Sequence, residues 1–576
     1  MLSDRGAVVL AVAVAAGAWW HGPVPLAIGL VAVVVSLAVR WPWLLVVGGF
    51  ALAASLGQRA FDGMDPVPAA PYVGPVTLLA DPSPTPFGTR VDVRVGDKRI
   101  ELEATGGAGG TVDRALAGER LLVTGRLRPP PPDAPWLVPR HVVGRLDLTR
   151  AEPLDGGSAP WRAANHVRRV LGRGAEVLPE DAQGLYGGFV LGDDRGQTAE
   201  VVDDFRGAGL THLLVVSGQN VAFVMVLASP ITNRLRLGSR WAVTLGIIAA
   251  FGVLTRFEPS VLRASAMAAL AVTAALAGRP AGTLRTLALA VSGLVLIDPL
   301  LVRSVGFQLS VAASVGIAVL GPRIVEHLRG PAWWRDALGI TLAAQLGVAP
   351  VLVPRFGGMP VVSIAANVVA VPVAGLVTTW GLPAGLVAGL GGTAVAKLVH
   401  LPTRWLIGWV AGVARVAAGV PLGEVDTVGL LVVAAAGGVW LALARRRPTW
   451  RVARRGCIAA MIATLLVPAV ALRSPPLRQD PTVGVAVYRA GGATVVVLEE
   501  QPTARRLLEA LRRAGVRRID VLAAVDEPDP TLVAALRHRW PVGRVLAEDA
   551  GPARIQLGGL LVDTTGTRPE VVESPR

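Results

Sequence analysis

The sequence is poor in cysteine, in lysine and in charged residues altogether. Its single cysteine, Cys457, excludes an intramolecular disulfide framework and a zinc site built from several cysteines. Charged residues make up 17% of the 576 positions, whereas soluble domains carry about 25%. With 52% hydrophobic residues and a mean hydropathy of +0.54, the composition excludes both a fully soluble protein and a disordered one.

The net charge of +15 is almost entirely arginine, because Lys98 and Lys397 are the only lysines. Six arginines between positions 445 and 455 form the densest basic segment. The positive-inside rule places such a segment in the cytoplasm. Much of the charge is therefore expected to set membrane topology rather than to form one nucleic-acid-binding patch.

Long apolar runs predict two membrane blocks. The first contains runs at 7–20, 24–39 and 43–56, each short of the ~20 residues of a straight span but flanked by interfacial tryptophans. A cleaved signal peptide fits the first run less well, because a second run follows at once. The spans predicted for the second block are 213–228, 241–254, 261–276, 284–297, 307–320, 338–353, 361–378, 382–399, 428–443 and 457–471, with 407–420 either spanning or lying at the interface.

Two stretches outside these runs have the texture of soluble domains. Between 60 and 150, prolines separate alternating segments at 76–79, 89–95, 99–104, 119–127 and 141–148, which predict a small β-barrel or sandwich. The glycine-rich segment 106–110 is expected to be a flexible hairpin connection, and 160–205 to be amphipathic helix.

The tail after 482 alternates strand and helix patterns. Strands are predicted at 483–488, 494–499, 520–525, 544–547 and 556–562, and helices at 504–514 and 530–539. With the basic segment inside, the span 457–471 carries this small α/β domain to the outer face. Arg5 and Arg40 flank the first spans on the inner side, which places the β domain outside as well.

The most informative segment is GAGLTHLLVVSGQNV at 207–221, which follows LYGGFVLGDDRG at 185–196. It brings His212, Ser217, Gln219 and Asn220 to the start of an apolar run. Polar groups at membrane depth are costly unless they face a bundle interior or water. Two interpretations stay open: hydrogen bonding between helices, or the lining of a water-filled path.

This segment resembles the signature of the ComEC family, the inner-membrane DNA channel of bacterial natural transformation. The resemblance continues, in order, at 260–263, 278–280, 298–299, 306–310, 345–350, 355–357 and 367–372. The upstream β domain resembles the family's OB-fold-like domain. Asn220 departs from the family pattern, because many members have a histidine there. That departure puts a proton or metal role at this position in doubt, but not a polar pore lining.

The resemblance implies that one DNA strand passes through the membrane core. Arg263 lies near the start of a predicted span, where a charged arginine is energetically costly unless it is paired or faces water. Single-stranded DNA binds in positively charged grooves, so an arginine that faces water could contact it. For Arg279 and Arg303, placement in loops under the positive-inside rule is an equal alternative. The residues expected along the path are His212, Ser217, Gln219, Asn220, Arg263, Gln308, Ser310, Gln345 and Asn367.

In the family, the tail corresponds to a metallo-β-lactamase-like nuclease that holds two metals through a His-x-His-x-Asp-His motif. The matching positions after strand 520–525 are Glu527, Asp529, Thr531 and Leu532, and none is a histidine. His538 is expected on a helix, facing solvent. We therefore expect a degenerate domain without catalytic residues, metal or cofactor. Weak binding of Mg²⁺ or Mn²⁺ by Asp526, Glu527 and Asp529 is the minor alternative.

The expected fold class is a polytopic α-helical membrane protein with an extracytoplasmic OB-fold-like β domain and a small α/β C-terminal domain. The domain boundaries are predicted at 1–58, 59–150, 151–473 and 474–576. The expected function is plasma-membrane import of single-stranded DNA in competence. An integral-membrane nuclease and a transporter or scaffold are the alternatives. Expected partners are membrane lipid, a surface DNA receptor and a cytoplasmic helicase-like motor, with a homo-oligomer left open.

Overall fold

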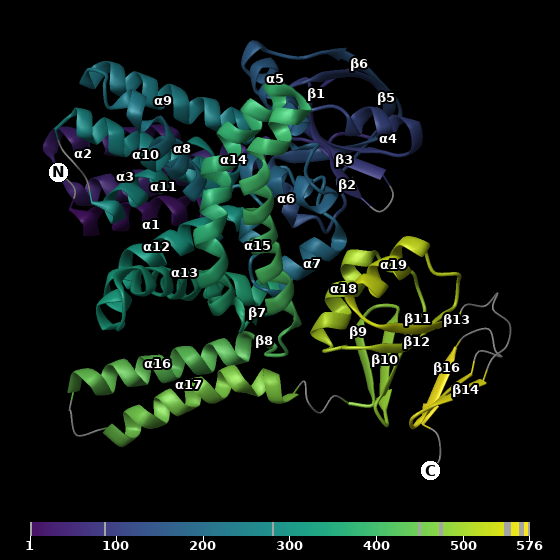
Figure 1. Ribbon diagram of the computed structural model, residues 1–576. Helices are drawn as coiled ribbons and strands as arrows, with labels where there is room; N and C mark the ends of the chain where they lie inside the picture. Colours follow the sequence, from purple (N-terminus) through teal and green to yellow (C-terminus); the bar gives the residue numbers. More distant parts are fainter. Residues whose placement is uncertain are drawn as a thin grey trace. The chain divides into compact units, whose positions relative to one another are not determined.

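The structure, a computed structural model, describes residues 3–85, 88–278, 282–446, 451–471, 476–546, 554–563 and 569–573 (Figure 1). The chain divides into two compact units. Unit 1 comprises Met1–Gly196, Val215–Val351 and Pro372–Ile407, and unit 2 comprises Gln197–Leu214, Leu352–Val371 and Gly408–Arg576. Each unit is described by itself. The four predicted domain boundaries remain a prediction.

The first three helices of unit 1 follow the three predicted apolar runs. They are α1 (Asp4–Trp20), α2 (Leu26–Val39) and α3 (Pro42–Asp62). α1 begins where the Ser3 hydroxyl accepts a hydrogen bond from the Gly6 amide. α1 and α3 pack closely because Gly17 lacks a side chain. A Cβ at that position would lie 2.2 Å from the Phe50 carbonyl oxygen of α3.

The predicted β domain is present. A strand lies at or near each of the five predicted positions, and most of these strands are longer than predicted. Its strands are β1 (Ala70–Leu78), β2 (Ser83–Thr85), β3 (Gly88–Val95), β4 (Lys98–Ala104), β5 (Arg120–Arg128) and β6 (Val142–Asp155). The sheet order is β1-β5-β6-β4-β3-β2, and an additional β1–β3 pairing closes it on itself. β4 and β6 run parallel, whereas the other neighbours are antiparallel. Alternating residues such as Val91, Val93 and Ile100 fill the interior.

The expectation of a flexible connection at 106–110 was wrong. These glycines begin helix α4 (Gly106–Asp113), which lies between β4 and β5 in the chain. The helix is held by tertiary contacts, because Val112 is fully buried in the core of the β domain and Asp113 accepts a hydrogen bond from the Thr89 hydroxyl at 2.6 Å. Packing therefore outweighs the poor intrinsic helix propensity of glycine.

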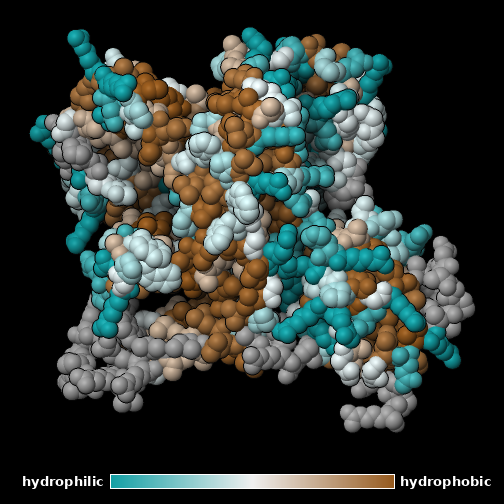
Figure 2. Space-filling model, in the orientation of Figure 1, coloured by the Kyte–Doolittle hydropathy of each residue, from teal (hydrophilic) through white to brown (hydrophobic). Residues whose placement is uncertain are grey.

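Helices make up the rest of unit 1. They are α5 (Ala159–Ala175), α6 (Glu180–Leu191), α8 (Gly218–Thr232), α9 (Leu237–Leu254), α10 (Pro259–Leu276), α11 (Thr283–Ile297), the 3₁₀ helix η3 (Pro299–Arg303), α12 (Val305–His327), most of α13 (Ala332–Phe356) and most of α14 (Ser363–Val399). In the described part of the chain, six helices are long and apolar enough to cross a membrane: α3, α9, α10, α12, α13 and α14. Figure 2 shows apolar surface over α14 in the middle of the view. Leu376, Val387 and Leu390 of this helix are exposed.

Three predicted spans have different limits in the structure. The run 213–228 does not begin as helix, because Thr211–Leu213 is a 3₁₀ turn and α8 starts only at Gly218. The runs 361–378 and 382–399 form one segment, α14, despite Pro383. The break lies instead at Gly392, whose φ of 80° suits a residue without a Cβ.

Unit 2 joins helical segments to the tail. Its elements before the tail are α7 (Ala199–Gly207), most of α15 (Leu401–Gly419), the short strands β7 (Met359–Pro360) and β8 (Glu424–Val425), α16 (Thr427–Arg446) and α17 (Arg451–Ala471). The predicted helical character of 160–205 is thus confirmed by α5, α6 and α7. Arg447 of the basic segment lies outside the described residues, so the orientation remains a prediction.

The tail is an α/β domain, as predicted. Its main sheet has the order β13-β12-β11-β10-β9, formed by β9 (Arg478–Thr482), β10 (Val485–Ala490), β11 (Ala493–Leu498), β12 (Ile519–Ala524) and β13 (Val542–Leu546). Helices α18 (Ala504–Arg513) and α19 (Pro530–Arg539) pack on one face, and β14 (Arg554–Leu557), β15 (Leu560–Asp563) and β16 (Glu570–Glu573) pack on the other. The prediction of a single strand at 556–562 was wrong. The segment is a hairpin, because Gly558 turns the chain with φ 55°.

Candidate functional site

The signature segment 207–221 folds as a capped helix start. Ser217 has an extended backbone, and its hydroxyl accepts a hydrogen bond from the Gln219 amide at 3.3 Å, so the residue is the N-cap of α8. The same hydroxyl lies 3.4 Å from the Asn220 side-chain oxygen. Ser217 and Gln219 therefore lie at the N-terminal end of the apolar helix α8 rather than in its middle.

Arg263 of α10 lies directly against this helix start. A Cβ built on Gly218 would be 2.6 Å from Nη2 of Arg263, so a side chain at position 218 would displace the guanidinium from where it lies. Nε of Arg263 donates to the Ser310 hydroxyl of α12 at 2.7 Å, and Nη1 lies 3.2 Å from the Met267 sulfur. The predicted residues Ser217, Arg263 and Ser310 thus converge, and we call Ser217, Gly218, Ser260, Arg263 and Ser310 the Arg263 cluster.

Ser260 fixes α10 to the segment that precedes α8. Its hydroxyl donates to the Val216 carbonyl oxygen at 2.8 Å, one turn of helix before Arg263. The signature motif and the motif at 260–263 are therefore in contact, although the bonded residues Val216 and Ser260 are 44 positions apart in the chain. Across the described residues, no ion pair joins Arg263 to a carboxylate, so its charge is met by a hydroxyl and a thioether.

Two predicted path residues bind backbone carbonyls instead. Asn220 is buried, and its side-chain amide donates to the Phe189 carbonyl oxygen of α6 at 3.0 Å. The same carbonyl oxygen also accepts a hydrogen bond from the Thr378 hydroxyl of α14 at 3.2 Å. Gln308 donates to the Val302 carbonyl oxygen at 2.6 Å. These bonds are those of interhelical hydrogen bonding, the other interpretation of the polar insertions. A place for Asn220 and Gln308 on a DNA path stays a prediction.

The remaining predicted residues are dispersed. Gln219 and His212 are exposed, and Gln345 is half-buried on α13. Asn367 is buried and donates to the Ser363 carbonyl oxygen, one turn earlier in α14, at 2.7 Å. His212 and Asn367 belong to unit 2, whereas the Arg263 cluster belongs to unit 1.

The other arginines near the membrane blocks have structural partners or lie outside the description. Arg303 lies over the Trp19 ring, 4.6 Å from its centroid, and donates to the Trp19 carbonyl oxygen. Arg285 pairs with Asp4 at 2.8 Å. Arg279 lies outside the described residues. Asp298 caps α11 and η3 and also pairs with His141 at 2.9 Å.

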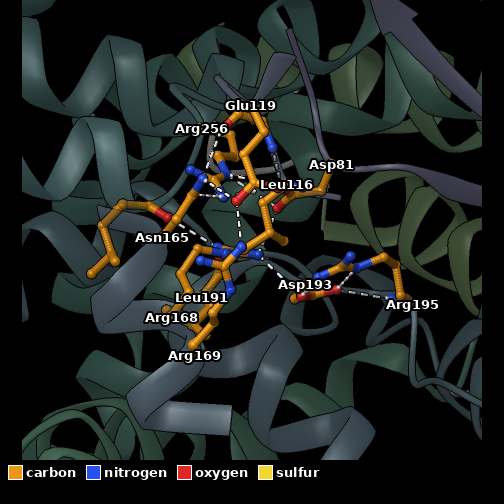
Figure 3. Close-up of polar contacts among 12 residues, drawn as sticks. Asp81, Leu116, Glu119, Asn165, Arg168, Arg169, Leu191, Asp193, Arg195 and Arg256 are labelled. Carbon is orange, nitrogen blue, oxygen red and sulfur yellow. Dashed lines mark hydrogen bonds and ion pairs between the residues drawn. The ribbon is translucent and has the colours of Figure 1, made fainter. Parts of the chain in front are cut away.

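Sequence reasoning missed a buried ion network around Arg168 of α5 (Figure 3). Nη2 of Arg168 lies 2.7 Å from Asp81 of the β domain and 3.1 Å from Asp193, and Nη1 donates to the carbonyl oxygens of Leu191 and Leu254. One guanidinium thus closes the C-terminal ends of α6 and α9. We call Asp81, Asn165, Arg168, Asp193 and Arg256 the Arg168 network.

The Arg168 network keeps its carboxylates charged. Burial by itself would raise the pKa of Asp81, but Arg168 and Arg256 outweigh it and hold that pKa below its usual range. Burial acts the same way on Asp193, where hydrogen bonds and charge from Arg195 and then Arg168 lower the pKa to about 2. The sequence did show the acidic residues of 185–196, but nothing in it pairs Asp81 with an arginine almost ninety positions away.

Within unit 2, the acidic residues of α7 hold the tail. Nε of Arg512 on α18 lies 3.1 Å from Asp203, and its Nη1 lies 3.3 Å from Glu424. Asp203 is 2% exposed, and Asp204 pairs with Arg539 of α19. The DDFR segment at 203–206 is therefore a docking element for the tail.

The positions that match the nuclease motif serve the packing of the tail. Leu532 is buried in the core between α18, α19 and the sheet. Asp529 accepts hydrogen bonds from the Thr531 amide and hydroxyl and so caps α19. His538 is exposed on α19, as predicted. Over the ranges that the structure describes, no group of three or more histidine, cysteine, aspartate or glutamate residues could hold a metal.

Comparison with known proteins gives two matches. The competence protein family model matches residues 189–449, a segment that contains the whole Arg263 cluster. The chain is also similar to ComE operon protein 3 of Bacillus subtilis, with 28% identity over 202 residues. These residues are 34% of this chain and 25% of the relative, so the similarity spans a quarter of that protein's length.

No solved structure matches the chain. The family model covers the motifs from 207 to 372 on which the resemblance to the ComEC family was built. In the described part of the chain, six helices have the length and apolar character of membrane spans. These findings support a ComEC-family assignment for this chain.

Proposed function

We propose that this protein lines a path by which one strand of DNA crosses the plasma membrane during natural transformation. The competence family supports a role in DNA uptake, and the Arg263 cluster supports a path through the helices of unit 1. Single-stranded DNA carries one negative charge per nucleotide and binds in positively charged grooves.

The observation that carries the proposal is the state of Arg263. A guanidinium at membrane depth is costly, and proteins ordinarily offset that cost with a carboxylate or a backbone carbonyl. Arg263 instead meets a hydroxyl, a thioether and the bare backbone of Gly218. Such a charge is suited to a mobile anion, and the phosphates of a passing strand are the anions that the family suggests.

The β domain fits an outer receiving domain for the DNA. With β2 set aside, its order closes five strands in a ring, β1-β3-β4-β6-β5, with a parallel β4–β6 pair and α4 between β4 and β5 in the chain. This order supports an OB-fold-like barrel, a fold that binds oligonucleotides. We place this domain and the tail on the outer face, as the arginine distribution predicts.

For the tail we propose a degenerate metallo-β-lactamase-like domain without nuclease activity. The support is chemical: Leu532 has no metal-binding atom and belongs to the core, and Asp529 is engaged as a helix cap. Stoichiometric, tightly bound zinc in the purified full chain would contradict this proposal.

By the same resemblance, a surface receptor delivers the DNA and a cytoplasmic helicase-like motor draws it inward. A homo-oligomer remains part of this proposal.

The experiment that tests the proposal is uptake of labelled DNA into the cytoplasm of the host. Deletion of the gene is expected to abolish uptake. Arg263→Glu is expected to reduce it at least tenfold, since a negative charge replaces the positive one, with unchanged abundance in the membrane fraction. Arg240→Glu is the matched control, because Arg240 is exposed at the start of α9. Normal uptake in the deletion strain would refute the channel, whereas an equal loss in the control would refute the role of Arg263.

A further inference from the structure

The turn between α9 and α10 has an unusual backbone. Arg256 and Phe257 follow one another with φ of 61° and 51°, in the left-handed region that residues with a Cβ avoid. Each such residue costs about 1–2 kcal/mol. This conformation persists only where the surroundings enforce it.

The surroundings of the turn are the β domain and α5. Nε of Arg256 donates to both oxygens of Asp81, at 3.2 and 3.1 Å, and its Nη2 donates to the Asn165 side-chain oxygen at 2.7 Å. The guanidinium also lies over the Trp161 ring, 5.3 Å from its centroid. The Arg256 side chain is 8% exposed. The guanidinium is therefore held by a carboxylate, an amide oxygen and an aromatic ring.

Asp81 is itself held in place by other bonds. It accepts from the Ala117 amide of the β domain at 2.9 Å and from Arg168 at 2.7 Å. Asn165 donates to the Ala117 carbonyl oxygen at 3.1 Å. The loop that carries Ala117 thus bonds to both groups that receive the Arg256 side chain, and the rigid β domain sets where that side chain ends.

The α9–α10 turn leads directly to the residues of the Arg263 cluster that lie on α10. α10 begins at Pro259, Ser260 bonds to the Val216 carbonyl oxygen, and Arg263 lies seven residues after Arg256. Since α10 is a continuous helix, the conformation of the turn determines where Arg263 meets Gly218 and Ser310.

We propose that Arg256, anchored by Asp81 of the β domain, is a positioning residue that holds the α9–α10 turn in its left-handed conformation and thereby places Arg263 against the start of α8. The link to DNA passage rests on the proposed function, whereas the positioning does not. The β domain is then more than a receiving domain, because its loop residue Asp81 sets the geometry of the Arg263 cluster.

Two substitutions at position 256 separate positioning from mere ion pairing. Arg256→Ala and Arg256→Gly both remove the guanidinium, but only glycine adopts a φ near 61° without strain. Both leave Asp81 paired with Arg168. In the purified full chain, we expect Arg256→Ala to speed amide hydrogen exchange about tenfold in 255–263 and in 216–221, the factor that corresponds to one strained residue. Arg256→Gly is expected to stay within about threefold of the parent protein, because its turn carries no strain.

Asp81→Asn is expected to resemble Arg256→Ala, and Asp97→Asn is the control, since Asp97 is an exposed carboxylate of the same domain. Equal acceleration by alanine and glycine at 256 would overturn the proposal in favour of a purely structural ion pair. Acceleration confined to 255–258 would overturn the link to Arg263.

DNA uptake provides the second readout. Arg256→Ala is expected to lower uptake about tenfold and Arg256→Gly to retain it, as the backbone strain predicts. If the exchange results hold while Arg263→Glu leaves uptake unchanged, the positioning stands and the proposed function fails. If Arg263→Glu abolishes uptake but the exchange rates do not change as expected, the proposed function stands and the positioning role of Arg256 fails.

Discussion

The Arg263 cluster and the Arg168 network each contain a central arginine in unit 1, but the two guanidinium groups have opposite electrostatic surroundings. Arg168 is 3% exposed in its side chain and is met by two carboxylates and two helix-end carbonyls. Arg263 is met by one hydroxyl and one thioether. A neutralised charge joins parts of a fold, whereas a charge without a counterion remains open to an anion.

The largest expected effect comes from breaking the Arg168 network at its centre. Arg168→Met leaves Asp81 and Asp193 buried without their shared partner and is expected to destabilise unit 1 by about 3–5 kcal/mol. Thermal unfolding of the purified protein and abundance in the membrane fraction measure this effect. Arg169→Met is the control, because Arg169 is half exposed and pairs with Glu119, a carboxylate outside the Arg168 network. Equal stability of the two variants would show that the network does not hold the fold.

The docking of the tail on α7 is expected to be the next most sensitive point. Arg512→Met removes the partner of Asp203 and is expected to cost about 2–3 kcal/mol, the value of hydrogen bonds to a charged group. The cost is smaller than for Arg168, because Glu424 keeps Arg513 at 3.3 Å. Trypsin cleavage of the tail should accelerate in Arg512→Met and not in Arg517→Met, which alters an exposed arginine. Unchanged cleavage would contradict the docking role of the DDFR segment.

Acid should weaken the Arg168 network over a defined range. Because the pKa of Asp193 is lowered to about 2, the stability it contributes is complete above pH 4 and is lost as the pH falls towards 2. The expected loss is about 2 kcal/mol for a shift of this size. The melting temperature should therefore be level between pH 7 and 5 and fall below pH 4, with a smaller fall in Asp193→Asn. An equal fall in that variant would assign the acid sensitivity to other groups.

The smallest effect on stability is expected at Arg263. Arg263→Met loses one hydroxyl contact and no ion pair, so stability should change by less than about 1 kcal/mol. Uptake should nevertheless fall, since the positive charge is gone. Melting temperature and uptake, measured on Arg263→Met beside Arg168→Met, sharpen the comparison. A loss of stability as large as that of Arg168→Met would place Arg263 among the structural arginines.

Local patterns predicted much of the fold. Alternation gave the strands of the β domain, and long apolar runs gave α1, α2, α3 and most later helices. The failures have tertiary causes: the glycines at 106–110 become helical because Val112 enters the core, and α14 continues through Pro383 to Gly392. Ser217 and Arg263 were singled out because polar residues are conspicuous in apolar runs, yet the role of Asn220 as a bond to α6 was not decided by the sequence.

The sequence by itself determined the long apolar helices and the motifs that match the competence protein family, because hydropathy and motifs are local properties of the chain. The tertiary structure alone decided which arginine is neutralised and which is not. Asp81 and Arg256 are 175 positions apart, and Arg263 and Ser310 are 47 apart. Electrostatic energy depends on distances of a few ångströms between side chains, and only folding sets those distances.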